Sequence, residues 1–181
     1  MKRLFVILSL LGLTACSSVQ KVYNAMAADE VIPANTSAVD ALLKKAQRGL
    51  DPTQSILVAT LVNIDNLNQS SRFGRVTSEQ ISAHLTNLGF SVVELKLREN
   101  IFIQGQGELF LSREVNELSV KHKAQGVLVG TYAVAGCFVY LNLKIIGGSD
   151  NVAISAHSYK VPLNDVIRPM FPYGQVPSGS C

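Results

Sequence analysis

The chain has 181 residues, of which 16 are basic, 13 are acidic and 48% are hydrophobic. This length suits a single domain with a sizeable core. No run or stripe of lysines and arginines occurs along the chain, which argues against nucleic acid as a partner.

The first fifteen residues have the pattern of a bacterial secretory signal. Lys2 and Arg3 precede an apolar run over residues 4–13, which is too short to cross a bilayer of about 30 Å as a helix. Residues 13–16, Leu-Thr-Ala-Cys, resemble a lipobox, in which the Cys16 thiol receives a diacylglycerol before cleavage. We expect a lipoprotein signal peptide over residues 1–15 and lipidation at Cys16. The alternative is an ordinary secretory signal that carries a cysteine.

Cleavage before Cys16 removes two of the basic side chains, so the mature chain has a net charge of +1. Ser17, where an aspartate would indicate inner-membrane retention, implies sorting to the outer membrane with the domain facing the periplasm. Residues 16–36 show little periodicity, and we expect a lipidated tether there. We expect the folded domain over residues 37–167 and an irregular, proline-containing tail over residues 168–181.

Hydrophobic periodicity predicts an α/β fold. The expected elements are a helix from Ser37, a strand over 56–64, a helix over 74–88, a strand over 90–98, a helix from Ser112 to Gly126, and strands over 127–135, 138–146 and 152–161. The strand over 56–64 lacks a polar face and is expected to be covered on both sides. Short turns join the last strands, which makes them antiparallel neighbours. We therefore expect a single two-layer domain, whose mixed sheet has two strand–helix–strand crossovers followed by a three-stranded antiparallel meander.

A polar segment from Asp65 to Arg75 follows the first strand, at an edge where open α/β sheets tend to bind ligands. One interpretation is a structured turn in which a serine caps the next helix. The other is a protein-binding surface, with arginines contacting carboxylates or carbonyls and Phe73 acting as an aromatic anchor. The candidate partner-binding residues are Asp65, Asn66, Arg72, Phe73 and Arg75.

A second candidate surface lies on the meander. Phe138, Tyr140, His157 and Tyr159 are expected to form a semi-apolar outer patch that suits protein contact. The alternative is that the tether or the C-terminal tail covers this face.

Cys137 and Cys181 are the thiols that remain once Cys16 is lipidated. In an oxidising periplasm they are a candidate disulfide, which would stabilise the fold by roughly 3–4 kcal/mol on the loop-entropy model. The alternative is a buried Cys137 with a free thiol at the C-terminus.

The sequence contains no recognisable catalytic or metal-binding pattern. His84, His122 and His157 have no cysteine, histidine or carboxylate at metal-ligand spacing. There is no Gly-x-Ser-x-Gly elbow, and residues 105–107 lack the remainder of a phosphate-binding loop. We expect no enzymatic activity, no metal and no cofactor. A hydrolase remains the enzymatic alternative, because members of a catalytic triad need not be adjacent in sequence.

Several separated motifs share one resemblance. They are Val-Asn-Ile-Asp-Asn-Leu-Asn at 62–68, Ser-Ser-Arg-Phe-Gly-Arg at 70–75, Ser-Glu-Gln at 78–80, Gly-Glu-Leu-Phe-Leu-Ser-Arg-Glu at 107–114 and Gly-Thr-Tyr at 130–132. Together they resemble the FlgO family of flagellar outer-membrane lipoproteins, over roughly residues 50–162. The general plan is also similar to the small α/β domains of the TolB amino-terminal, CsgG and LpoB types.

The FlgO resemblance implies a non-enzymatic outer-membrane lipoprotein. Such a protein would support flagellar assembly, stability or motility through contacts with periplasmic or flagellar proteins. The alternative is an adaptor of the LpoB or CsgG kind, acting on a periplasmic enzyme or a secretion machine. The family brings no catalytic residues to this chain.

Overall fold

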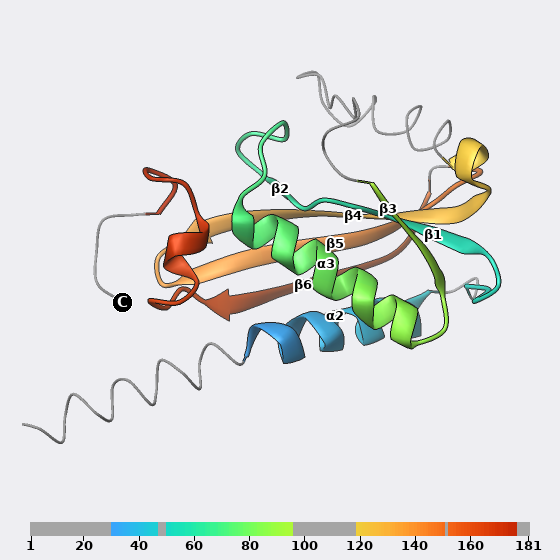
Figure 1. Ribbon diagram of the computed structural model, residues 1–181, viewed down its shortest axis with the longest axis horizontal. Helices are drawn as coiled ribbons and strands as arrows, with labels where there is room; N and C mark the ends of the chain where they lie inside the picture. The colour runs from blue at the N-terminus through green and yellow to red at the C-terminus, as the bar shows by residue number, and fades with distance from the viewer. Residues whose placement is uncertain (1–29, 47–49, 96–118, 151, 177–181) are drawn as a thin grey trace, which may run out of the picture.

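The computed structural model describes residues 30–46, 50–95, 119–150 and 152–176. These residues form one mixed sheet of six strands with helices packed on one face (Figure 1), which confirms the expected α/β class. In chain order the elements are α2 (Val31–Lys45), β1 (Ser55–Ala59), β2 (Val62–Asn63), α3 (Arg72–Asn87), β3 (Ser91–Leu95), β4 (Ala124–Ala135), β5 (Phe138–Gly147), β6 (Ala153–Pro162) and the 3₁₀ turn η1 (Arg168–Met170).

The strand order is β3-β1-β4-β5-β6, and β2 pairs separately with β4. Strand β1 is parallel to both β3 and β4, as two crossovers require, and α3 forms the crossover between β1 and β3. Strands β4, β5 and β6 form the expected antiparallel meander. The expected third helix lies largely outside the described residues, which include only its last turn, at residues 119–122.

The apolar run over residues 56–64 is not one strand. The chain leaves the regular ladder after Ala59 and pairs with β4 again only at Val62–Asn63. Between the two strands the Leu61 amide donates to Ser78 Oγ of α3 at 2.8 Å, so this backbone group is bonded to the helix instead of the sheet. The expected burial on both faces is confirmed, because Val58 packs towards the helices and Leu57, which is 0% exposed, lies in a separate cluster.

Helix α2 begins at Val31 and not at Ser37. Pro33 is compatible with this start because the first turn of a helix needs no amide hydrogen from it. Val31, Ala38, Val39 and Leu42 are buried in the main core. The expectation of a tether over residues 16–36 is therefore wrong for residues 31–36, which are helical.

Buried polar contacts fix α2 against the sheet and α3. The Asn35 side chain is 0% exposed, donates from Nδ2 to Gln80 Oε1 at 2.6 Å and accepts from the Tyr159 hydroxyl at 2.5 Å. The Ser155 hydroxyl of β6 donates to the Leu42 carbonyl oxygen at 2.8 Å. Because each contact joins different elements, the network orients the helix as well as satisfying buried polar atoms.

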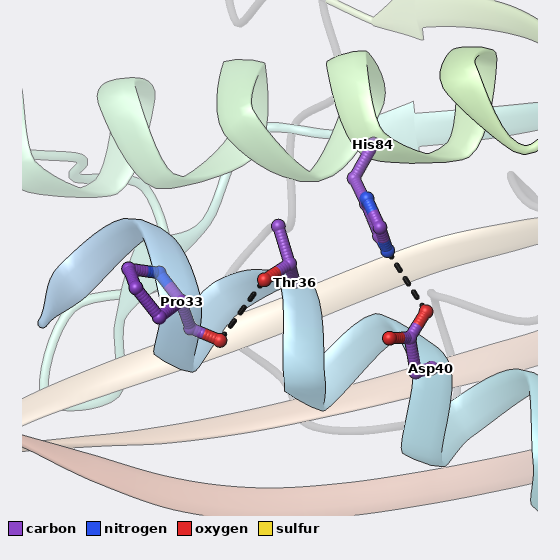
Figure 2. A network of polar contacts seen from close by, with 4 residues as sticks. All are labelled: Pro33, Thr36, Asp40 and His84. Atoms are coloured by element: carbon purple, nitrogen blue, oxygen red, sulfur yellow. Dashed lines mark hydrogen bonds and ion pairs between the residues drawn. The ribbon is translucent and has the colours of Figure 1, made fainter.

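A more exposed contact joins the two helices. Figure 2 shows the His84 ring of α3 reaching towards the Asp40 carboxylate of α2, with 2.8 Å between Nε2 and Oδ1. Nearby, the Thr36 hydroxyl donates to the Pro33 carbonyl oxygen at 3.0 Å (Figure 2). His84 is thus an inter-helix contact residue in this structure.

The structure corrects the predicted outer patch on the meander. Tyr159 pairs with Leu141 and His157 pairs with Leu143, and directly opposed residues share one face of an antiparallel sheet. Leu141 and Leu143 are in the main core, so Tyr159 and His157 lie on the helix face. The alternation was counted correctly along the strand, but its inward side was assigned wrongly.

The C-terminal segment also differs from expectation. Residues 168–170 form η1, and the Phe171 side chain is 7% exposed within the main core. Residues 168–171 therefore belong to the packed fold and are not an irregular tail. Cys137 is disulfide-bonded, and its partner lies outside the described residues, so pairing with Cys181 stays a prediction.

The helix preceding β4 ends earlier than Gly126, which lies within β4 itself. Lys123 turns the chain with a φ of 50° instead. A Cβ atom at Gly126 would lie 2.9 Å from the Ile146 carbonyl oxygen, so glycine here permits close pairing with β5 and does not end a helix.

Tyr159→Phe tests the network around Asn35. Burial raises the pKa of the Tyr159 hydroxyl above its usual value of 10.0. As the pH rises past the unfolded value, the unfolded chain loses this proton while the folded chain retains it, so folding stability declines in alkali. The variant should lose about 1–2 kcal/mol at neutral pH, because Asn35 Oδ1 loses its donor, and should show a shallower alkaline decline. Urea unfolding at neutral and alkaline pH measures both effects, with Tyr173→Phe at a fully exposed site as the control.

Candidate functional site

The polar segment after β2 is a loop held by internal hydrogen bonds. The Asn63 amide donates to the Gln69 carbonyl oxygen at 2.8 Å, and the Gln69 amide donates to the Asn66 carbonyl oxygen at 2.9 Å. Asn63 Oδ1 and Asn66 Oδ1 accept from the amides two residues further on, Asp65 at 3.0 Å and Asn68 at 3.2 Å. These Asx-type contacts confirm the prediction of a structured turn.

Two serines connect this loop to α3 and the sheet. Ser71 has an extended conformation, and its Oγ accepts from the Gly74 amide at 3.1 Å, which confirms a serine cap on the helix. Ser70 Oγ donates to the Leu61 carbonyl oxygen at 2.6 Å. The Ile64 amide donates to the Tyr132 carbonyl oxygen at 3.0 Å, so the loop is also bonded to β4.

Four of the five predicted partner-binding residues are exposed on this structure: Asp65, Asn66, Arg72 and Arg75. Ile64, which the sequence did not single out, joins them with 49% of its surface exposed. We call Ile64, Asp65, Asn66, Arg72 and Arg75 the β2–α3 surface.

The arginines of the β2–α3 surface lie in the first turn of α3, which contains no acidic residue. No ion pair or hydrogen bond joins their side chains to other groups of the described chain. Positive charge at a helix N-terminus is unfavourable for the helix dipole, so these arginines do not serve helix stability. Their guanidinium groups remain available for anionic groups.

Phe73 is not available as an aromatic anchor. Its side chain is 1% exposed, stacks on Phe171 with ring centroids 5.1 Å apart, and meets Tyr132 edge-on at 6.2 Å. The helix turns Phe73 inward while Arg72 and Arg75 face outward. The prediction that it contacts a partner is corrected: Phe73 is a core residue beneath the β2–α3 surface.

Tyr132 lies at the centre of this aromatic cluster and was missed from the sequence. Its side chain is 1% exposed, and its hydroxyl is buried beside Ser71. Burial raises the pKa of this hydroxyl, and the nearby Ser71 moderates the increase. The position of Tyr132 in an alternating strand is a signal that could have placed it inward, whereas Phe171 sits among prolines and gives no such signal.

The potential nucleophiles have structural contacts. Ser70 and Ser71 bond to backbone groups, and Cys137 is disulfide-bonded. Across the described ranges, no group of three or more His, Cys, Asp or Glu side chains could hold a metal ion. Within the same ranges, the helices are too short or too polar to cross a membrane.

The second surface is the side of the meander opposite α2 and α3. We call it the open face and define it by Phe138, Tyr140, Asn142, Lys144, Ser158 and Lys160. Pairing in the β5–β6 ladder places Tyr140 beside Lys160 and Asn142 beside Ser158. The Lys160 Nζ lies 3.9 Å from the centroid of the Phe138 ring, and Ser158 Oγ donates to Asn142 Oδ1 at 2.8 Å. Phe138 and Tyr140 are therefore placed as predicted, with Ser158 and Lys160 of β6 where His157 and Tyr159 were expected.

The fold is similar to solved LpoB domains. The LpoB C-terminal domain from Escherichia coli matches with a TM-score of 0.50 and 12% identity, over 70% of this chain and 97% of that domain. The solution structure of Escherichia coli LpoB matches with a TM-score of 0.53 and 16% identity, over 70% of this chain and 64% of that one. At these identities the likeness defines the class of fold alone. No curated protein sequence gives a match.

The family model described as FlgO protein matches residues 36–166, which is more than half of the chain. The chain therefore belongs to the FlgO family, in agreement with the resemblance of its motifs. The matched range contains both the β2–α3 surface and the open face.

Proposed function

We propose that the chain is a non-enzymatic outer-membrane lipoprotein that supports flagellar assembly, stability or motility by binding a periplasmic or flagellar protein. Lipid attached to Cys16 anchors it, and the domain faces the periplasm. Membership of the FlgO family supports the flagellar context. The observation that carries the proposal is the β2–α3 surface, which lies within the family's range and combines a hydrogen-bonded loop with two arginines of α3 that form no ion pair in the described part of the chain.

The geometry of this surface suits recognition more than catalysis. The loop is already ordered by its own hydrogen bonds, so little conformational entropy is lost when a partner binds. Arg72 and Arg75 are one helical turn apart and can contact carboxylates or carbonyls of one partner segment. Ile64 adds apolar contact area at the edge of the same surface.

A site-specific photo-crosslinker at Asn66 tests this function in the native envelope. The expected result is a crosslink to a flagellar or periplasmic protein that disappears in the Arg72→Glu/Arg75→Glu variant, together with impaired swimming. A crosslinker at Ser37, exposed on α2, is the positional control. Normal swimming and intact flagella in a deletion strain would contradict the flagellar role.

The alternative is an envelope adaptor that acts on a periplasmic enzyme or a secretion machine, and the LpoB-like fold favours it. The same crosslinking experiment separates the two functions. Capture of a peptidoglycan synthase or a secretion component, and of no flagellar protein, would support the adaptor. Loss of lipid labelling in Cys16→Ser would support the anchor in either case.

A further inference from the structure

The open face has an unbalanced charge. Lys144 and Lys160 are exposed on it. The described strands contain a single acidic residue, Glu94, which pairs with Val58 and therefore lies on the opposite, helix-packed face. The strand positions of the open face therefore carry positive charge and no carboxylate.

The same face presents directional groups at defined places. Tyr140 is 43% exposed and lies directly across the ladder from Lys160. Lys160 is held over the Phe138 ring, and the Asn142 and Ser158 side chains bond to each other between the two lysines. Lys144 pairs with Ala156, four residues from Lys160 along β6. The lysines are thus about 14 Å apart along the strand direction.

We propose that the open face binds an acidic, extended segment of a partner protein. Carboxylates four residues apart in an extended chain have the same spacing of about 14 Å, so one segment can reach both lysines. Tyr140 packs against the segment beside the carboxylate that meets Lys160, and the Asn142–Ser158 pair offers hydrogen bonds to the backbone between the two charges. This binding uses a surface other than the β2–α3 surface and does not depend on it.

The observations favour a protein segment over an anionic bilayer. Lysines near an anionic membrane contribute about 1 kcal/mol each whatever their exact arrangement. Here the Phe138 ring positions Lys160, and the hydrogen-bonded Asn142–Ser158 pair lies at the centre of the face. These features match a partner whose charges have a fixed spacing. A bilayer surface makes no use of that spacing.

The test uses the mature chain with Cys16→Ser, because the lipid would itself bind vesicles. A fluorescent peptide rich in threonine and valine, with two glutamates four residues apart, is titrated at low ionic strength. Lys144→Glu/Lys160→Glu should weaken its binding at least about tenfold. Lys44→Glu/Lys45→Glu, at exposed positions in the last turn of α2, changes the net charge equally and should leave binding within about twofold.

An isomeric peptide with adjacent glutamates should bind more weakly than the spaced peptide. The proposal would be overturned if the two charge-matched variants lost the same amount of peptide affinity, or if the two peptides bound equally well. Either result would mean that net charge alone explains the binding. Binding to phosphatidylglycerol vesicles but to neither peptide, abolished by Lys144→Glu/Lys160→Glu, would overturn it in favour of a membrane. Circular dichroism checks that each variant is folded. The crosslinking at Asn66 is a separate measurement, so failure of either proposal leaves the other intact.

Discussion

Replacing Phe73 with alanine is expected to lower the free energy of unfolding by about 3–5 kcal/mol. The Phe73 ring is 1% exposed and contacts both Tyr132 and Phe171, so truncation leaves a cavity that joins α3, β4 and the C-terminal segment. The lost aromatic contacts add to the cost of the cavity. Denaturant unfolding followed by circular dichroism measures the change.

Phe73→Leu is the matched control, because it retains most of the buried volume and should cost much less than the alanine variant. Asn66→Ala, on the exposed side of the same loop, should leave stability nearly unchanged. A Phe73→Ala protein of normal stability that no longer binds its partner would contradict the burial of this ring and restore its role as an anchor.

The fold class could be predicted from sequence because, along the meander, the alternation of apolar and polar residues and the residues of the turns both indicate antiparallel strands. In β5, Val139, Leu141, Leu143 and Ile145 are buried as the period of two predicts. The interruption near Leu61 could not be predicted, because it depends on Ser78, which lies on a helix later in the chain. The early start of α2 was missed because its N-terminal turn is stabilised by tertiary contacts of Val31 and Asn35, which leave no local pattern.

The candidate site likewise has some features that the sequence predicts and others that it does not. The exposure of Arg72 and Arg75 can be predicted from the local sequence, and so can the serine cap, because these two features depend on where α3 begins. The inward direction of Phe73 depends on Phe171, which is nearly a hundred residues away and has no local pattern that would place it in the core. The side of β6 that faces inward was likewise decided by α2, through Asn35 and Tyr159. Long-range packing, and not local propensity, set each missed feature.

Replacing Gly74 with alanine is expected to destabilise the protein by about 3 kcal/mol, at the upper end of the cost of overpacking. In an ordinary helix the same change is stabilising by roughly 1 kcal/mol. Here the added Cβ would lie 2.5 Å from the Leu61 carbonyl oxygen, 2.7 Å from Ser70 Oγ and 2.9 Å from Tyr132 Cε1. Thermal and denaturant unfolding measure the sign as well as the size of the effect.

The control is Ser82→Ala in the same helix, where the buried hydroxyl has no hydrogen-bond partner in the described part of the chain and its removal should be neutral or slightly stabilising. Relief of the Gly74→Ala clash requires Leu61 and Ser70 to move, and their mutual hydrogen bond holds the loop before α3. The variant should therefore also weaken crosslinking from Asn66 at temperatures where the domain is still folded. Unchanged stability with unchanged crosslinking would show that the loop is not packed against α3 as this geometry requires.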